Sequence, residues 1–185
     1  SEQKFLYENG ISDYIAELAG ERSLTQPVLW HLETQGRDRA DKDEYKLKAD
    51  FSFCVSNTVN TLEYYHNSSY LEYGGSPDRA VRVAFVYALD KYMKAAGKYN
   101  KNESKITFAD VADCLVLVIN SFSTMTSYEN QTKKSITNSF IYEAMTEFLK
   151  KHLEFYFTEN PTSAEIFANQ VLVNKRSRET AERAR

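Results

Sequence analysis

The chain has 185 residues, which is enough for one domain with a hydrophobic core and cramped for two. Its 42% hydrophobic and 14% aromatic content excludes a disordered tail, and its longest apolar run is about a third of the ~20 residues that span a membrane. The net charge of −3 argues against a whole surface that attracts nucleic acid, so any DNA contact should be local. We expect a cytoplasmic protein without a membrane partner.

The first elements alternate between helix and strand. Apolar spacings of three and four over residues 8–18 predict a short helix that ends at Gly20. Residues 28–33 predict a strand, and the polar segment 34–43 predicts a solvated turn.

The clearest alternation covers residues 45–55, where every second residue is apolar and the residues between them are mostly polar. A period of two over this length predicts a half-buried strand. Residues 62–66 are expected to form its partner strand after a turn. The apolar face consists of Tyr45, Leu47, Ala49, Phe51, Phe53 and Val55.

A helix is predicted after Gly75, with Ser76 as its N-cap and Pro77 in the first helical position. Its apolar stripe runs from Val81 to Tyr92, and Gly97 ends it. Residues 107–113 then predict one or two helical turns, which lead into a buried strand over 115–119.

The last third of the chain predicts two helices. The first covers residues 141–157 and stops before Pro161, while Thr162 and Glu165 offer a capping box for the second. From Asn174 onward the second helix loses its apolar face, so we expect this end to be a connector that packing on the domain does not hold.

Together these elements predict an α+β fold, a half-exposed β-sheet with helices on one side. Cys54 and Cys114 are expected to be small buried hydrophobes and not a disulfide or metal pair. The three histidines show no ligand spacing, so no metal site is predicted.

Residues 131–134 place an amide, a hydroxyl and two ammonium groups in a row between the buried strand and the long helix. This composition is a weak indication of an anionic ligand, and an ordinary exposed lysine is the alternative. The chain has no Gly-rich phosphate loop followed by Lys-Ser/Thr and no Gly-x-Ser-x-Gly motif, which leaves no recognised enzyme signature.

Gln131-Thr132-Lys133, followed by Asn138-Ser139 and a long helix that ends in Glu159-Asn160-Pro161, resembles the transducer domain of type IIA DNA topoisomerases, as found in DNA gyrase B and its topoisomerase IV counterpart. The resemblance implies the ribosomal protein S5 domain 2-like fold with a left-handed βαβ crossover. It also implies a transducer domain over residues 1–173, with residues 174–185 as the end of a connector helix that leads to a further domain.

The resemblance further implies that Gln131 and Lys133 contact the terminal phosphate of ATP in a neighbouring ATPase domain. ATP and Mg²⁺ would be bound mainly by that domain, so the chain alone is expected to hold no cofactor and to be catalytically inactive. The implied partners are the ATPase domain and a downstream metal-binding domain of the same polypeptide, the gyrase A-type protein that carries the DNA-cleaving tyrosine, double-stranded DNA, and a second copy of the full-length protein.

Aligning Gly74-Gly75 and its helix with the family places Arg82 on an arginine that faces DNA in the closed clamp, with Arg79 as a weaker candidate. Here the chain departs from the family, because Ser76-Pro77 replaces Thr-His. The basic end of the last helix adds the DNA-facing candidates Lys175, Arg176 and Arg178. For these groups, self-paired charges on a solvated helix are the alternative.

Two other functions compete with the transducer. One is a stand-alone α+β interaction module in which the lysine loop has no nucleotide role. The other is a small-molecule kinase of the same fold, but the glycine-rich phosphate loop of such kinases is missing.

Overall fold

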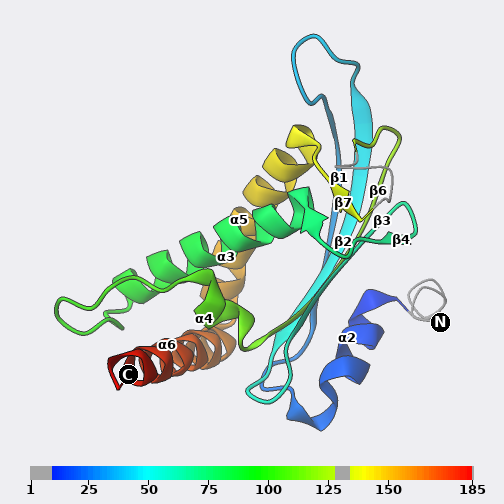
Figure 1. Ribbon diagram of the computed structural model, residues 1–185. Helices are drawn as coiled ribbons and strands as arrows, with labels where there is room; N and C mark the ends of the chain where they lie inside the picture. The colour runs from blue at the N-terminus through cyan, green and yellow to red at the C-terminus, as the bar shows by residue number, and fades with distance from the viewer. Residues whose placement is uncertain (1–9, 128–133, 185) are drawn as a thin grey trace.

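The computed structural model describes residues 10–127 and 134–184, and in these residues one five-stranded mixed sheet carries the domain (Figure 1). The strand order is β1-β2-β6-β3-β4, and a separate two-stranded pair, β5-β7, lies beside it. The strands are β1 (Val28–Gly36), β2 (Tyr45–Val55), β3 (Thr61–His66), β4 (Ser69–Tyr70), β5 (Gly74–Gly75), β6 (Leu115–Ser123) and β7 (Ser135–Ile136). The helices are α2 (Ile11–Ala19), α3 (Ser76–Ala95), α4 (Phe108–Ala112), α5 (Ser139–Glu159) and α6 (Pro161–Arg183), with a 3-10 turn η1 (Gly20–Arg22) after α2.

Strand β2 confirms the predicted alternation. The predicted apolar face is buried against the long helices, while Lys46 and Lys48 on the opposite face are exposed. In the second half of the strand the opposite face is buried as well, because Ser52 is covered and Cys54 packs against α2. Strand β1 pairs with β2 along its whole length and continues to Gly36, three residues into the segment predicted as a solvated turn.

Strand β3 pairs with β6, in parallel, and not with β2 as the sequence predicted. Strand β6 lies between β2 and β3. The reason is its composition, because Leu115 to Ile119 are buried without alternation, and a strand that is apolar on both faces belongs in the centre of a sheet.

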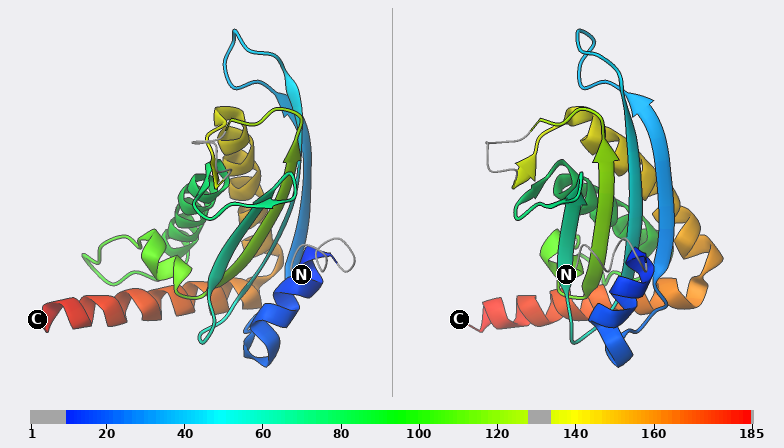
Figure 2. Two further views of the ribbon diagram at one scale, coloured as in Figure 1. Left: turned by 45° about the vertical axis from the view of Figure 1, so that its right-hand side comes forward. Right: turned by 90° about the vertical axis from the view of Figure 1, so that its right-hand side faces the viewer.

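The long helices α3, α5 and α6 cover one face of the sheet, and α2 packs on the other face (Figure 2). The predicted α+β architecture is confirmed, with the addition that the second face is partly covered. Ile15 of α2 is buried there with Cys54 and Val118. Both cysteines are buried and free, as predicted.

Two helix starts differ from the prediction. Gly75 at φ 84°, not Ser76, precedes the first turn of α3, and the Ser76 hydroxyl instead donates to the carbonyls of Ile136 and Asn138. Asn160 alone separates α5 from α6, so Thr162 lies inside α6 and caps nothing. Within the described residues, no helix combines the length and apolarity that a membrane span needs.

Candidate functional site

The predicted phosphate-contacting residues, Gln131 and Lys133, lie outside the described residues, but both flanks of their segment are described. On the first flank, the Ser127 N–H donates to Asn138 Oδ1 at 2.7 Å. The Thr137 N–H in turn donates to the Ser127 carbonyl at 2.7 Å. These bonds hold the residue before the segment against residues that follow it, so the two ends of the segment lie close together.

The second flank is held by the β5-β7 pair. Gly74 and Gly75 pair in parallel with Ser135 and Ile136, and the Tyr73 N–H donates to the Lys134 carbonyl at 2.9 Å. A Cβ on Gly75 would overlap the Ile136 carbonyl oxygen, so only glycine permits this approach. The start of α3 thereby fixes where the segment ends.

The side chain of Lys134 is exposed and forms an ion pair with Glu72 at 3.0 Å. This partner raises the pKa of Lys134 through the hydrogen bond and the negative charge. Lys134 therefore faces solvent and already has an acidic partner.

Asn138, at the base of α5, is buried and joins this frame to the turn between β1 and β2. Its amide donates to Asp38 Oδ2 at 3.0 Å and to the Tyr45 hydroxyl at 3.2 Å. Asp38 also accepts from the Tyr45 hydroxyl and from the Phe140 N–H in the first turn of α5. A carboxylate is favourable there because the helix N-terminus presents free N–H groups. Burial, followed by the bond to Asp38, raises the pKa of Tyr45.

His66 contacts the residues that lead from the end of β6 into the segment. Its ring is fully buried, with Nδ1 2.7 Å from Ser121 Oγ and Nε2 2.9 Å from Ser123 Oγ. The Thr126 hydroxyl lies 3.3 Å from Nε2. Burial lowers the pKa of His66 to about 4, so the ring is neutral at pH 7.

The DNA-facing candidates on α3 occupy its exposed side. Arg82 is half exposed, donates to Asp78 at 2.7 Å and lies over the Phe108 ring. Arg79 is exposed and stacks on the Tyr142 ring at 4.4 Å. Both guanidinium groups are held on the helix surface and remain within reach of solvent.

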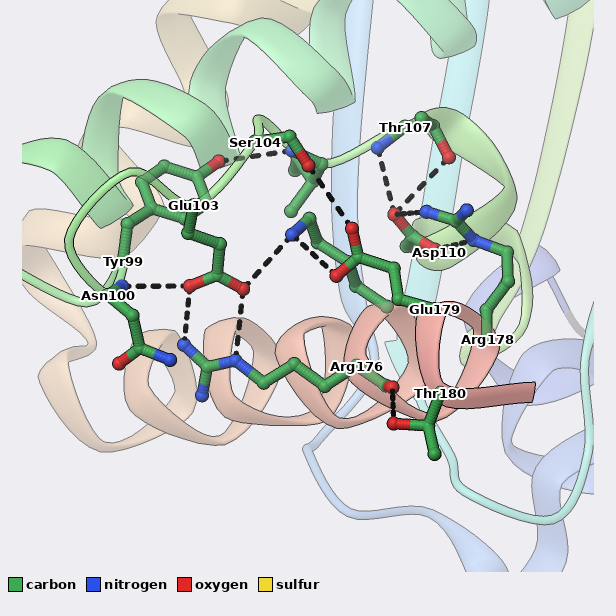
Figure 3. Close-up of polar contacts among 12 residues, drawn as sticks. Tyr99, Asn100, Glu103, Ser104, Thr107, Asp110, Arg176, Arg178, Glu179 and Thr180 are labelled. Atoms are coloured by element: carbon green, nitrogen blue, oxygen red, sulfur yellow. Dashed lines mark hydrogen bonds and ion pairs between the residues drawn. The ribbon is translucent and has the colours of Figure 1, made fainter. Parts of the chain in front are cut away.

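The basic end of α6 is arranged differently from the prediction (Figure 3). Lys175 has no exposed surface, and its ammonium lies 3.0 Å from both Glu103 and Glu179. Arg176 donates to both carboxylate oxygens of Glu103, at 3.0 and 2.8 Å. This corrects the expectation that Lys175 faces DNA. It also corrects the expectation that this end of the helix does not pack on the domain, because ion pairs to Glu103 hold it there.

Arg178 forms a second such contact. Its guanidinium donates to both carboxylate oxygens of Asp110, at 2.9 and 3.2 Å, and Asp110 is 1% exposed (Figure 3). The same carboxylate accepts from the Thr107 N–H and hydroxyl and so caps α4. The alternative, in which charges of α6 pair with one another, is confirmed in part. Glu179 pairs with Lys175 and Glu182 pairs with Arg178 within the same helix.

Glu103 is the centre of the α6 contacts. The bond from Arg176, followed by those from Asn100 and Lys175, lowers its pKa to about 2 despite partial burial. Sequence reasoning missed Glu103, Asp38 and His66, because nothing local to each of them indicates a partner 55 or more residues away. One signal for Lys175 was available, since it lies four residues after Val171 and three after Leu172, on the apolar stripe.

Among the described residues, no group of three or more His, Cys, Asp or Glu side chains could hold a metal ion. The described flanks frame residues 128–133, whose sequence includes the amide of Gln131 and the ammonium group of Lys133 as hydrogen-bond donors. Such donors suit an anion.

Comparison with known proteins matches this chain along nearly its whole length. A family model described as DNA gyrase B matches residues 10–185. The DNA gyrase B protein of Campylobacter jejuni subsp. jejuni is 23% identical over 183 residues, which cover 99% of this chain and 23% of that protein. The DNA gyrase B protein of Metamycoplasma arthritidis is 28% identical over 184 residues, which cover 99% of this chain and 29% of that protein. The chain thus spans less than a third of the length of these relatives.

Solved structures share the fold. The 43K ATPase domain of Thermus thermophilus gyrase B, in complex with an aminocoumarin, superimposes with a TM-score of 0.79 at 22% identity, over 96% of this chain and 46% of that chain. The topoisomerase IV ATP-binding domain of Francisella tularensis, in complex with a small-molecule inhibitor, gives a TM-score of 0.71 at 19% identity, over 92% of this chain and 44% of that chain. The predicted ribosomal protein S5 domain 2-like fold is confirmed.

Proposed function

Because the chain belongs to the DNA gyrase B family and resembles its transducer domain, we propose that it senses ATP for a strand-passing type IIA topoisomerase. Gln131 and Lys133 contact the terminal phosphate of ATP held in a neighbouring ATPase domain. The domain then couples this contact to closure of a clamp around DNA and to strand passage.

The observation that supports this proposal is the rigid frame around residues 128–133. Asn138 and Ser127 close one side of the frame, and the pairing of Gly75 with Ile136 closes the other. A short segment with fixed ends loses less conformational entropy when it binds than a free loop does. The frame therefore favours a contact that forms and breaks without remodelling the domain.

The chemistry of the donors also fits. A charge-assisted hydrogen bond from an ammonium to a phosphate oxygen contributes on the order of 1.5–3 kcal/mol. Moving a two-state equilibrium from 1:99 to 99:1 needs roughly 5.5 kcal/mol of differential binding. Lys133 therefore acts together with other contacts, for which we propose the closure of a dimer of the full-length protein.

The remaining partners follow from the same proposal. The chain works between an ATPase domain and a downstream metal-binding domain of its own polypeptide, together with a gyrase A-type protein and double-stranded DNA. ATP, bound mainly outside this chain with Mg²⁺, supplies the terminal phosphate whose presence is sensed. Arg82, with Arg79 beside it, contacts DNA phosphates. Membership of the DNA gyrase B family favours this function over the alternative, a stand-alone interaction module.

The test is Lys133→Ala in the full-length protein, measured as steady-state ATP hydrolysis. Loss of about 1.5–3 kcal/mol from the transition state corresponds to a fall in kcat of about 10- to 150-fold. Lys134→Ala removes a neighbouring ammonium that already has Glu72 as its partner, so its kcat should stay within about twofold.

Lys151→Ala removes an exposed lysine from the middle of α5 and controls for the loss of one positive charge. Unchanged ATP hydrolysis in Lys133→Ala, with both controls behaving as expected, would remove the proposal.

A further inference from the structure

The last buried side chain of α6 is a charged one, that of Lys175. Val171 and Leu172 are the last buried apolar residues, and the next buried position one turn on is Lys175. Its aliphatic stem continues the stripe while its ammonium meets Glu103 and Glu179. At position 175 the core-facing side of α6 therefore carries an ion-paired lysine where an apolar side chain would continue the stripe.

The acids that hold α6 come from one segment, residues 98–110, which joins α3 to α4 and includes the start of α4. Glu103 holds Arg176 as well as Lys175, and Asp110 holds Arg178 (Figure 3). The Ser104 hydroxyl donates to Glu179, and the Asn174 amide donates to the Asp110 carbonyl. We call this segment the latch. Most of its contacts with α6 lie between Asn174 and Glu179, and Lys98 also donates to Glu165 and Asn169 earlier in the helix.

The contacts of the latch differ in kind from the apolar packing before it. Apolar surfaces tolerate small slides and rotations because they have no directional bonds. A buried ammonium or carboxylate that loses its partner carries a large desolvation penalty, and buried ion pairs are best known for fixing one register. Only one axial and rotational position of α6 satisfies Lys175, Arg176 and Arg178 together.

The latch lies at the far end of the two helices that begin beside the proposed ATP sensor. Helix α5 starts beside the flanks of the 128–133 segment and runs about 30 Å to Asn160, where α6 starts at once. Helix α6 then crosses below α3 and α5, and its far end lies under the latch (Figure 2). The start of α5, beside the proposed sensor, and the latch thus lie at opposite ends of two helices that the single residue Asn160 joins.

We infer that residues 98–110 are a latch that locks the end of α6 in register, so that movement of the domain is passed rigidly to whatever follows α6. Glu103 is the positioning residue of this device. The inference rests on the proposed function, in that the movement is the response to ATP. It assigns Lys175, Arg176 and Arg178 to transmission of this movement and not to DNA contact.

The first measurement is hydrogen exchange of residues 174–183 in the full-length protein with Glu103→Gln. This variant keeps the shape of the side chain and removes the charge that Lys175 and Arg176 share. Exchange of these amides should rise at least about tenfold. The amides of 161–172 should stay within about twofold, because apolar packing and the contacts of Lys98, which Glu103→Gln leaves in place, hold them. Glu182→Gln is the matched control, because it removes an exposed acid paired with Arg178 on the same helix.

The second measurement is strand passage per ATP hydrolysed in the reconstituted enzyme. With Glu103→Gln, ATP hydrolysis should stay within about twofold and passages per ATP should fall at least about fivefold. Unchanged exchange in 174–183 would overturn the latch. Raised exchange with unchanged passages per ATP would overturn its role in transmission.

Arg176→Ala serves as a second variant in case Glu103→Gln fails to fold, since Lys175 then remains paired with Glu103. It should change both readouts in the same direction and to a smaller extent. The proposed function fails on a separate observation, unchanged ATP hydrolysis in Lys133→Ala, so failure of the latch and failure of ATP sensing are distinguishable.

Discussion

Asn138 donates a hydrogen bond of 3.0 Å to the carboxylate of Asp38, which lies 100 residues earlier in the chain. The two residues join the turn after β1 to the start of α5. Since Asn138 also accepts a hydrogen bond from the Ser127 N–H, this bond connects the β1-β2 turn to the frame of the proposed sensor.

Replacing Asp38 with alanine should therefore destabilise the domain. The change leaves the buried Asn138 amide and the Phe140 N–H without this acceptor, at a cost of about 2 kcal/mol. Urea denaturation would measure the loss. Asp41→Ala, which removes an exposed acid from the same turn, should change the free energy of unfolding by less than about 0.5 kcal/mol. Equal effects of both variants would contradict the role of Asp38.

His66 should make stability depend on pH. Its pKa in the folded state, about 4, is below the 6.5 of an unfolded histidine, so between these values the unfolded chain binds a proton that the folded chain does not. Stability should fall as the pH falls from about 6.5 to 4, with a slope of at most about 1.4 kcal/mol per pH unit.

The difference in unfolding free energy between the wild type and His66→Asn, measured from about pH 7 to 4, isolates this contribution. It also cancels the opposite effect of His31, whose pKa is raised by Asp50 and Glu33. A difference that stays constant across this range would show that burial does not depress the pKa of His66.

Gly75 should tolerate no side chain. At φ 84°, alanine is strained, and its Cβ would overlap the Ile136 carbonyl that pairs β5 with β7. We expect Gly75→Ala to cost about 3 kcal/mol or more and to lower ATP hydrolysis in the full-length protein. Gly97→Ala shares the positive φ but meets nothing within 4 Å, so it should cost only about 1–2 kcal/mol and leave ATP hydrolysis unchanged.

Arg82→Ala should reduce the salt dependence of DNA binding by the full-length protein. Loss of one phosphate contact lowers the slope of log K against log salt concentration by about 1. Arg37→Ala removes an exposed arginine of the β1-β2 turn that pairs with Glu44, and it should leave the slope unchanged. An unaltered slope in Arg82→Ala would remove the proposed DNA contact.

The sequence alone determined the elements whose signal is local. Alternation predicted β2 residue for residue, the apolar stripe predicted α3, and the Gln131-Thr132-Lys133 motif indicated the family. These features depend on the period of a strand or helix, or on a contiguous motif, so neighbouring residues contain all the information needed.

Only the tertiary structure decided the pairing of distant groups. It placed β6 between β2 and β3, joined Asn138 to Asp38, and buried Lys175 against Glu103. A lysine after an apolar stripe is equally compatible with a solvated helix end, and its burial becomes favourable only when folding supplies an acid from 72 residues away. Residue type sets what each group needs, and the fold decides which distant group meets that need.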